Sequence, residues 1–220
     1  ELMPIGRVEV EGARVHLFQR GERAARHHFT LSQAAVSRGG QGFNAFGTLL
    51  LSQDIGQSLF VSAKLEGLAT NGKGPSGELR VIARRVFLDK LPVLVRSVGA
   101  KTAAMRGRGT LDASLTLRDG RILEGSGQLS GRELEFAGGS RFDHFTVQSR
   151  LTRGRDGFAL EFTDLQVTRG ARLERAPRIA TKLSVVPGTL RLERVSAEAD
   201  RVPFMAAQLI AAALASRADT

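Results

Sequence analysis

Four histidines, His16, His27, His28 and His144, are the side chains of this chain best suited to bind a metal ion or to carry a proton at neutral pH. Histidines that bind one metal ion from a helix stand four residues apart, and carboxylates often complete the ligand set. No two of these histidines have that spacing, and no cluster of carboxylates lies near them in the sequence. His28 and His144 each precede a phenylalanine, so we expect structural or solvent-facing roles for both. The sequence therefore predicts no metal site.

The segment 72–77 has the spacing of the GxGxxG loop that binds dinucleotides. Such a loop requires a following helix, whose N-terminus meets the pyrophosphate. The residues that follow, 78–83, alternate in the manner of a strand, so we interpret the glycines as a loop between strands and expect no cofactor. The chain has no cysteine, which excludes a thiolate nucleophile, a disulfide and a zinc finger, and it has no Gly-x-Ser-x-Gly motif. We therefore expect no enzyme activity.

The chain is strongly basic, with 32 Lys and Arg residues against 22 Asp and Glu residues and a net charge of +10. The densest basic positions are the pair Arg84 and Arg85 and the arginines at every third position from Arg169 to Arg178. They suit phosphate, including that of anionic lipids, or a solvated face. The basic residues are spread over the whole chain, and its aromatic residues are 12 phenylalanines. This pattern does not resemble a stacking groove, so we expect no nucleic-acid partner, although a basic nucleic-acid-binding domain stays open as an alternative.

Apolar and polar residues alternate along most of the chain, which is typical of strands with one buried face. Between Arg7 and Leu17 valines alternate with charged residues, and similar patterns recur at 110–117 and 158–162. Turn signals such as Asp119-Gly120 separate these runs at short intervals. Such intervals favour hairpin connections over long crossovers. The sequence therefore predicts a mainly β fold with an antiparallel sheet, one face of which is apolar and the other wet.

Self-comparison of the sequence indicates a repeat with a spacing of about 115 residues. Five pairs of segments match in the same order: 28–31 and 144–147, 38–43 and 153–158, 61–65 and 179–183, 77–81 and 188–192, and 83–86 and 199–202. The alternative is that strands rich in arginine and glycine resemble one another without a repeat. We expect two related repeats, 1–104 and 105–220, each ending in a short helix. Asp89 can cap the first helix, at about 89–99, and Pro203 stands at the start of the second, at about 203–216.

The two ends of the sequence carry neither a signal peptide nor a membrane span. The sequence begins at Glu1 without a basic region followed by an apolar one. Its longest apolar stretch, 202–215, is shorter than the ~20 residues that cross a bilayer. We therefore expect this chain to be a fragment of a longer protein.

Four segments, 78–92, 125–131, 157–165 and 190–202, together resemble the AsmA-like periplasmic proteins, and most closely their YhdP branch. The resemblance extends over roughly residues 5–215 and consists of strand patterns. Related repeats often carry a tryptophan before the strand that begins near Phe158, whereas this chain has no tryptophan. The resemblance implies a long, curled antiparallel sheet that forms an open apolar groove. It also implies a protein anchored in the inner membrane of a Gram-negative envelope, which reaches across the periplasm and moves phospholipid to the outer membrane.

Acyl chains are the ligand that the expected apolar face suits best, because each buried CH₂ contributes ~0.8 kcal/mol and no catalyst is needed. Two short helices are too few to cover so much sheet, so we expect phospholipid acyl chains to occupy the groove and cover its apolar face. Membranes would be reached through parts of the protein outside this chain, and envelope proteins are possible further partners. The expected lining consists of Val8, Val10, Val15, Leu17, Leu49, Leu51, Val61, Leu65, Leu79, Val81, Leu111, Leu115, Leu117, Phe145, Val147, Phe158, Leu160, Phe162, Leu190 and Leu192. The alternative function is a structural or assembly β module of the cell envelope, with a dry core and a protein partner.

Overall fold

The computed structural model of the chain describes residues 6–17, 27–39, 42–67, 74–90, 105–136, 139–154, 157–185, 192–199 and 203–215. Within these residues the chain is mainly β, as the alternation predicts. The strands are β1 (Arg7–Leu17), β2 (His27–Gly39), β3 (Gly42–Leu50), β4 (Ser58–Glu66), β5 (Ser76–Phe87), β6 (Met105–Arg118), β7 (Arg121–Phe136), β8 (Arg141–Arg153), β9 (Gly157–Arg169), β10 (Arg172–Val185) and β11 (Leu192–Ala199). The described helices are the short 3₁₀ helix η1 (Leu88–Lys90) and the α-helix α2 (Phe204–Ala215).

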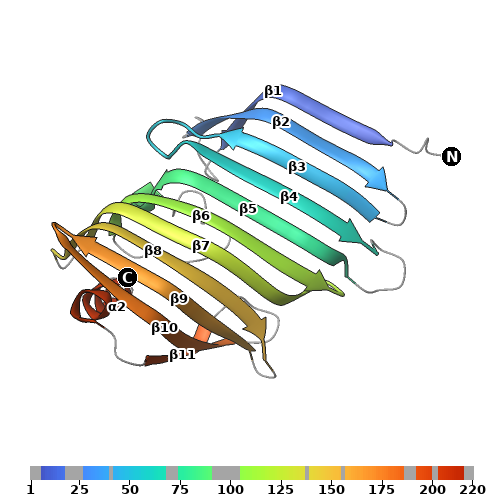
Figure 1. Cartoon of the computed structure of the whole chain (residues 1–220). Helices are drawn as coiled ribbons and strands as arrows, with labels where there is room; N and C mark the ends of the chain where they lie inside the picture. The colour runs from blue at the N-terminus through green and yellow to red at the C-terminus, as the bar shows by residue number, and fades with distance from the viewer. Residues whose placement is uncertain are drawn as a thin grey trace. The chain divides into compact units, whose positions relative to one another are not determined.

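The described strands follow one another in chain order, from β1 to β11, in one open sheet (Figure 1). The strand pairs whose registers are known are all antiparallel. The antiparallel sheet predicted from the sequence is thereby confirmed. Antiparallel strands that follow one another in the chain can be joined by a hairpin, as β6 and β7 are, so that neighbours in the chain become neighbours in the sheet.

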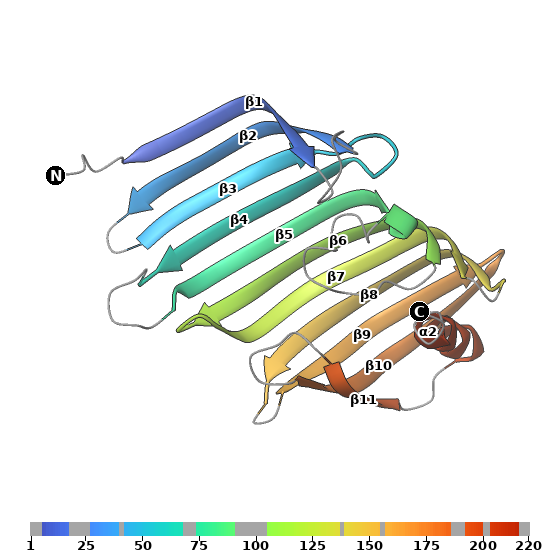
Figure 2. The ribbon, with the colours of Figure 1, turned by 180° about the vertical axis from the view of Figure 1, so that it is seen from behind.

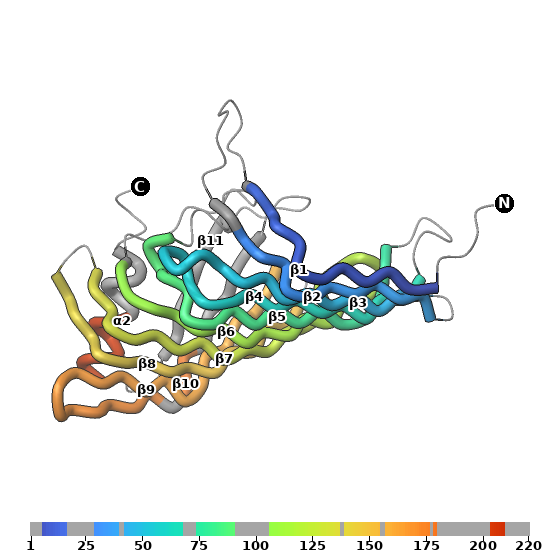
Figure 3. Tube along the Cα trace, turned by 90° about the horizontal axis from the view of Figure 1, so that it is seen from above, coloured from blue at the N-terminus to red at the C-terminus, as the bar shows by residue number. Residues whose placement is uncertain are grey.

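By its internal contacts the chain divides into two compact units. Unit 1 comprises residues 1–85 and 112–123, and unit 2 comprises residues 86–111 and 124–220. Within unit 1, β1 to β5 run side by side in chain order (Figure 1), and Figure 3 shows the same strands from above. The two expected repeats, 1–104 and 105–220, are defined by sequence similarity and stay a prediction.

The connection between β6 and β7 is a two-residue hairpin turn, as the Asp-Gly pair predicts. Asp119 and Gly120 both have positive φ angles, 51° and 74°. This is the backbone of a type I′ turn, whose twist matches that of the flanking strands. Glycine adopts such an angle without strain, and aspartate is among the few other residues that tolerate it.

Bulges in several strands keep apolar side chains on one face where simple alternation would not. Val10 and Val15 are an odd number of residues apart, so an unbroken strand would place them on opposite faces. Gly12 between them has φ +65°, and the β2–β3 register shifts between Leu31 and Gln33. Because of this extra residue in each strand, the registers place Val10 and Val15 on the same face.

A bulge of the same kind occurs in unit 2, at a residue that is not glycine. Asp164 of β9 has φ 52°, and the β8–β9 register shifts between Thr146 and Gln148. Phe162 and Leu165, three residues apart, consequently share a face. Residues with positive φ also include Arg85 in β5 and Glu133 in β7.

The expected helices are described to different extents. α2 lies where the sequence analysis expects the second helix, and it packs on β9 and β10 at one face of unit 2 (Figure 2). The first helix was expected at about 89–99. Only its start is described, as the end of η1, and residues 91–104 lie outside the described residues. Among the described helices, none is long and apolar enough to cross a membrane.

Candidate ligand-binding face

The registers of β1 to β5 gather apolar side chains on one face of unit 1. Directly paired residues of an antiparallel sheet point to the same side, so one row can be followed from strand to strand. One such row runs from Ala45 through Ala63 to Leu79. This face, here called the unit 1 apolar face, carries Val8, Val10, Ala13, Val15, Phe29, Leu31, Ala34, Val36, Phe43, Ala45, Leu49, Leu59, Val61, Ala63, Leu65, Leu79, Val81 and Ala83.

The opposite side of the same strands, the unit 1 polar face, is mostly polar. Its rows pair Ser62 with Arg80 and Lys64 with Glu78. Its large apolar exceptions are Phe46, Leu50, Phe60 and Ile82. Phe46 and Phe60 border, with Lys64 and Arg80, a shallow hollow of about 580 Å³. The two faces of unit 1 therefore differ sharply in character.

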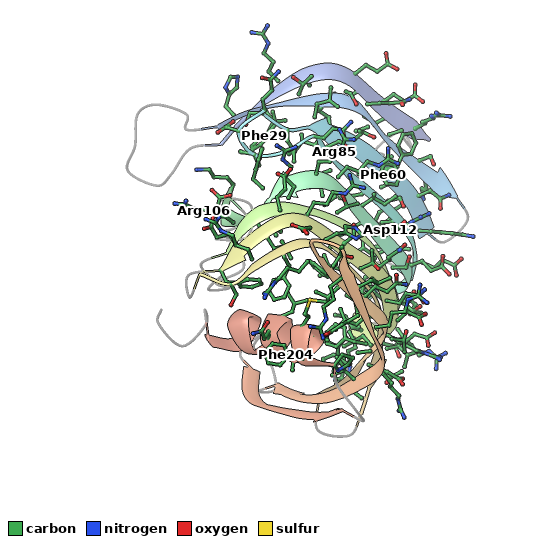
Figure 4. All side chains as sticks on the ribbon, turned by 60° about the vertical axis from the view of Figure 1, so that its left-hand side comes forward. Phe29, Phe60, Arg85, Arg106, Asp112 and Phe204 are labelled. Atoms are coloured by element: carbon green, nitrogen blue, oxygen red, sulfur yellow. The ribbon has the colours of Figure 1, made fainter. Side chains whose placement is uncertain are left out.

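An ion pair on the unit 1 polar face fixes the orientation of β6. The guanidinium of Arg80 donates two hydrogen bonds to the carboxylate of Asp112, at 3.0 and 2.7 Å. Figure 4 shows Asp112 and Phe60 on the same side of these strands. Since residues alternate along β6, Leu115 and Leu117 point to the unit 1 apolar face. The hydrogen bonds from Arg80 hold the pKa of Asp112 below its usual range.

The unit 1 apolar face is open at one end and closed at the other. Away from the bulges, Val8 and Val36 are each 48% exposed and pair with each other, and in the middle of the face Val61 is 36% exposed. At the bulged end Phe29 is only 2% exposed, and Leu51, just after β3, is 8% exposed. Valine side chains at the open end thus stay in contact with solvent in this structure, which is costly for a large apolar surface.

Unit 2 has an apolar face of its own, which is closed over part of its area. The registers place on it Leu129, Leu134, Phe142, Phe145, Val147, Leu151, Phe158, Leu160, Phe162, Leu165, Val167, Ala176 and Ile179. Leu134, Phe142 and Val167 are almost fully buried, and they form a core with Met205, Ala206 and Leu209 of α2.

The rest of the unit 2 apolar face is less covered. Leu151, Phe158 and Leu160 are half-buried and do not belong to the core beneath α2. Phe162 and Leu129 are also half-buried and pack against its border. The face therefore consists of a buried part under α2 and a more accessible part beyond it.

A carboxylate from the sheet holds the N-terminus of α2 in place. The backbone N–H of Met205 donates to Oε2 of Glu174 at 2.6 Å. The other carboxylate oxygen of Glu174 lies 2.7 Å from Nη2 of Arg172. A negative charge at a helix N-terminus satisfies a free N–H and interacts favourably with the helix dipole. Glu174 therefore fixes where α2 begins on the sheet.

Most of the expected lining residues lie on the two apolar faces. Val8, Val10, Val15, Leu49, Val61, Leu65, Leu79, Val81, Leu115 and Leu117 lie on the unit 1 apolar face, and Phe145, Val147, Phe158, Leu160 and Phe162 lie on the unit 2 apolar face. Phe145 and Val147 are buried in the core beneath α2, so they line a closed core and not an open surface.

The remaining expected lining residues have other positions. Leu51 is buried in the turn after β3, and Leu111 is half-buried in β6. Leu17 and Leu192 lie in β1 and β11, but their side chains are not among those described, and Leu190 lies outside the described residues.

The sequence analysis missed several residues of these faces. Phe29, Leu31 and Val36 of β2 are examples in unit 1, and Leu134 and Phe142 in unit 2. All belong to strands in which a bulge interrupts the alternation. The signal that could have found them is a pair of apolar residues three apart within a strand, such as Leu31 and Ala34.

The histidines are not brought together as a metal site in the described part of the chain. The register places His16 opposite His28, and His144 stands opposite Arg132 in unit 2. Among the described residues, no group of three or more His, Asp and Glu side chains could hold a metal ion.

Comparisons with known protein families, with curated proteins and with solved structures find no match to this chain. The resemblance to the AsmA-like proteins thus rests on the sequence patterns alone and stays a proposal.

Proposed function

We propose that this chain is a lipid-binding segment whose apolar sheet face holds the acyl chains of phospholipids. In this proposal it belongs to a periplasm-spanning, inner-membrane-anchored protein of the AsmA-like family that moves phospholipid between the inner and outer membranes without catalysis. The observation that carries the proposal is the unit 1 apolar face, which is apolar across β1 to β5 apart from Arg38 at its open end and remains partly exposed.

The chemistry of the face favours hydrocarbon over other ligands. Proteins rarely leave a contiguous apolar surface of more than a few hundred Å² exposed unless it binds something. A peptide or a nucleic acid laid on this face would lose hydrogen bonds to water, and the apolar side chains offer none in return. An acyl chain has no such groups, and each CH₂ that it buries contributes ~0.8 kcal/mol.

A continuous groove built from two repeats extends this proposal. The matched segments fall on strands in the same order, since 28–31 and 144–147 lie in β2 and β8, and 61–65 and 179–183 lie in β4 and β10. The bulges support a curved sheet, because a bulge bends its strand and increases the local twist. In this view each repeat contributes one stretch of the groove.

The alternative, a structural or assembly module, draws support from unit 2. Its core beneath α2 is closed to solvent, with Val167 and Ala206 fully buried. If unit 1 met a protein partner in place of lipid, its apolar face would be covered in a similar way. This alternative predicts a folded protein that carries no lipid.

Native mass spectrometry of the full chain, purified from a bacterial periplasm without detergent, tests the proposal. We expect phospholipid to co-purify with the wild type and to be largely lost in Val61→Asp, because a carboxylate in the middle of the apolar face must be desolvated under an acyl chain. Ser62→Asp is the matched control, since Ser62 is the next residue along β4 and faces the other side. A folded wild type without lipid, or equal lipid loading in both variants, would contradict the proposal.

A further inference from the structure

One arginine in the paired region of β1 to β5 stands on the unit 1 apolar face. Arg38 lies at the end of β2, two residues after Val36 and therefore on the same side of the strand. The register places it opposite Phe43 of β3. Among the described side chains that the registers of β1 to β5 place on this face, that of Arg38 is the only charged one.

Unit 2 repeats this arrangement. Arg153 lies at the end of β8, two residues after Leu151, and pairs with Phe158 of β9. It therefore shares a side with Leu151 and Leu160, on the unit 2 apolar face. These two arginine–phenylalanine pairs belong to the matched segments 38–43 and 153–158 of the sequence repeat.

Both arginines lie at the accessible end of their apolar face. Arg38 is exposed, and its neighbours at that end are Val36 and Val8, the most exposed valines of unit 1. Arg153 is also exposed, and it lies beyond the half-buried Leu151, on the side away from the core under α2. A cation at the open end of an apolar surface is complementary to an amphiphile with an anionic head.

Arg169, Arg172 and Glu174 also lie on the unit 2 apolar face and make contacts within the protein. Arg172 pairs with Glu174, which caps α2. The guanidinium of Arg169 lies 4.5 Å from the ring centre of Phe142, and its Nε donates to the carbonyl oxygen of Arg141 at 2.8 Å. These groups lie at the closed end, away from Arg153.

We infer that Arg38 and Arg153 each bind the phosphodiester headgroup of a phospholipid whose acyl chains lie on the apolar face beside it. The inference rests on the proposed function and adds the headgroup site and the orientation of the lipid to it. Arginine suits this role because its planar guanidinium presents several N–H donors in a geometry that matches phosphate. The headgroup would lie at the strand ends next to the arginine, and the chains would run toward the bulges.

Binding of two lipids that differ only in the headgroup tests the inference. The probes are phosphatidylglycerol and diacylglycerol with the same acyl chains, titrated against the full chain. We expect Arg38→Gln/Arg153→Gln to bind phosphatidylglycerol on the order of fivefold or more weakly per site, the effect of losing one partly exposed charged contact, and to bind diacylglycerol as the wild type does. Arg38→Lys/Arg153→Lys should recover part of the affinity, because the charge is kept and the fork is lost.

The control is Arg14→Gln/Arg150→Gln, which removes the same charge from the polar faces of β1 and β8. Binding in this control should match the wild type. Equal losses in the control and in the test variant, or equal losses for both lipids, would overturn the headgroup assignment while leaving the acyl-chain proposal intact. A wild type that binds neither lipid would overturn the proposed function itself.

Discussion

At the scale of the residue, which face a side chain occupies decides what a substitution does. Val61 and Ser62 are adjacent, yet one belongs to the apolar face and the other to a polar row with Arg80. The alternation of residue types predicts this difference wherever the strand is regular. It fails next to Glu133 and Asp164, which adopt positive φ angles although neither is a glycine. The residue types Glu and Asp do not indicate a bulge, so Leu134 and Leu165 could not be assigned to a face from the sequence.

The ion pair between Arg80 and Asp112 makes a pH-dependent contribution to stability. Because hydrogen bonds from Arg80 lower the pKa of Asp112 in the folded state, the folded state favours its ionised form. The contribution is therefore present above the pKa of about 4 that an aspartate has in the unfolded chain, and it is lost as the pH falls through the lower folded pKa.

We expect Asp112→Asn to lower the melting temperature at neutral pH, by a small amount because both side chains are about half exposed. The difference from the wild type should shrink as the pH falls from about 6 to about 2. Thermal unfolding of both proteins, followed by circular dichroism over this pH range, measures it. A difference of the same size in acid as at neutral pH would show that the ion pair is not its cause.

At the scale of the element, the strands and α2 were predictable, and the way that they pack was not. Alternating residues and turn pairs such as Asp119-Gly120 indicate strands and hairpins directly, and an apolar run after Pro203 indicates α2. The core beneath α2 depends on side chains from β7 to β10, which are distant in the sequence. Their meeting is a tertiary event that local patterns do not encode.

The capping of α2 by Glu174 is a further contact of this kind, since the two elements are separated by β11 in the chain. We expect Glu174→Ala to lower the free energy of unfolding by about 1 kcal/mol, because one N–H at the helix start loses its acceptor and the helix dipole loses a favourable charge. Urea unfolding measures this loss, and hydrogen exchange of the α2 amides should become faster.

Glu161→Ala is the matched control, because it removes another carboxylate that pairs with an arginine, Arg178, but makes no contact with α2 in the described structure. Its effect should stay within ~0.5 kcal/mol, as for most exposed ion pairs. Equal effects of the two substitutions on the α2 amides would argue against the capping role.

At the scale of the whole molecule, each unit separates an apolar face from a polar one. The predicted mainly β fold and open antiparallel sheet are confirmed, and many of the expected lining residues share a face. The strand registers could not be predicted from the sequence, because they depend on the bulges. A slip of one residue would turn every side chain of a strand to the other face. The repeats, the groove and the transport of lipid stay predictions that rest on the surface chemistry.

Photo-crosslinking with a phospholipid that carries a diazirine in its acyl chain tests the central claim most directly. The full chain is irradiated with this lipid, and the modified residues are mapped by tandem mass spectrometry. The account predicts adducts on residues of the unit 1 apolar face, such as Val36, Val61 and Val81, and none on their polar-face neighbours Ser37, Ser62 and Ile82. Adducts spread equally over both faces, or absent from the apolar one, would contradict it.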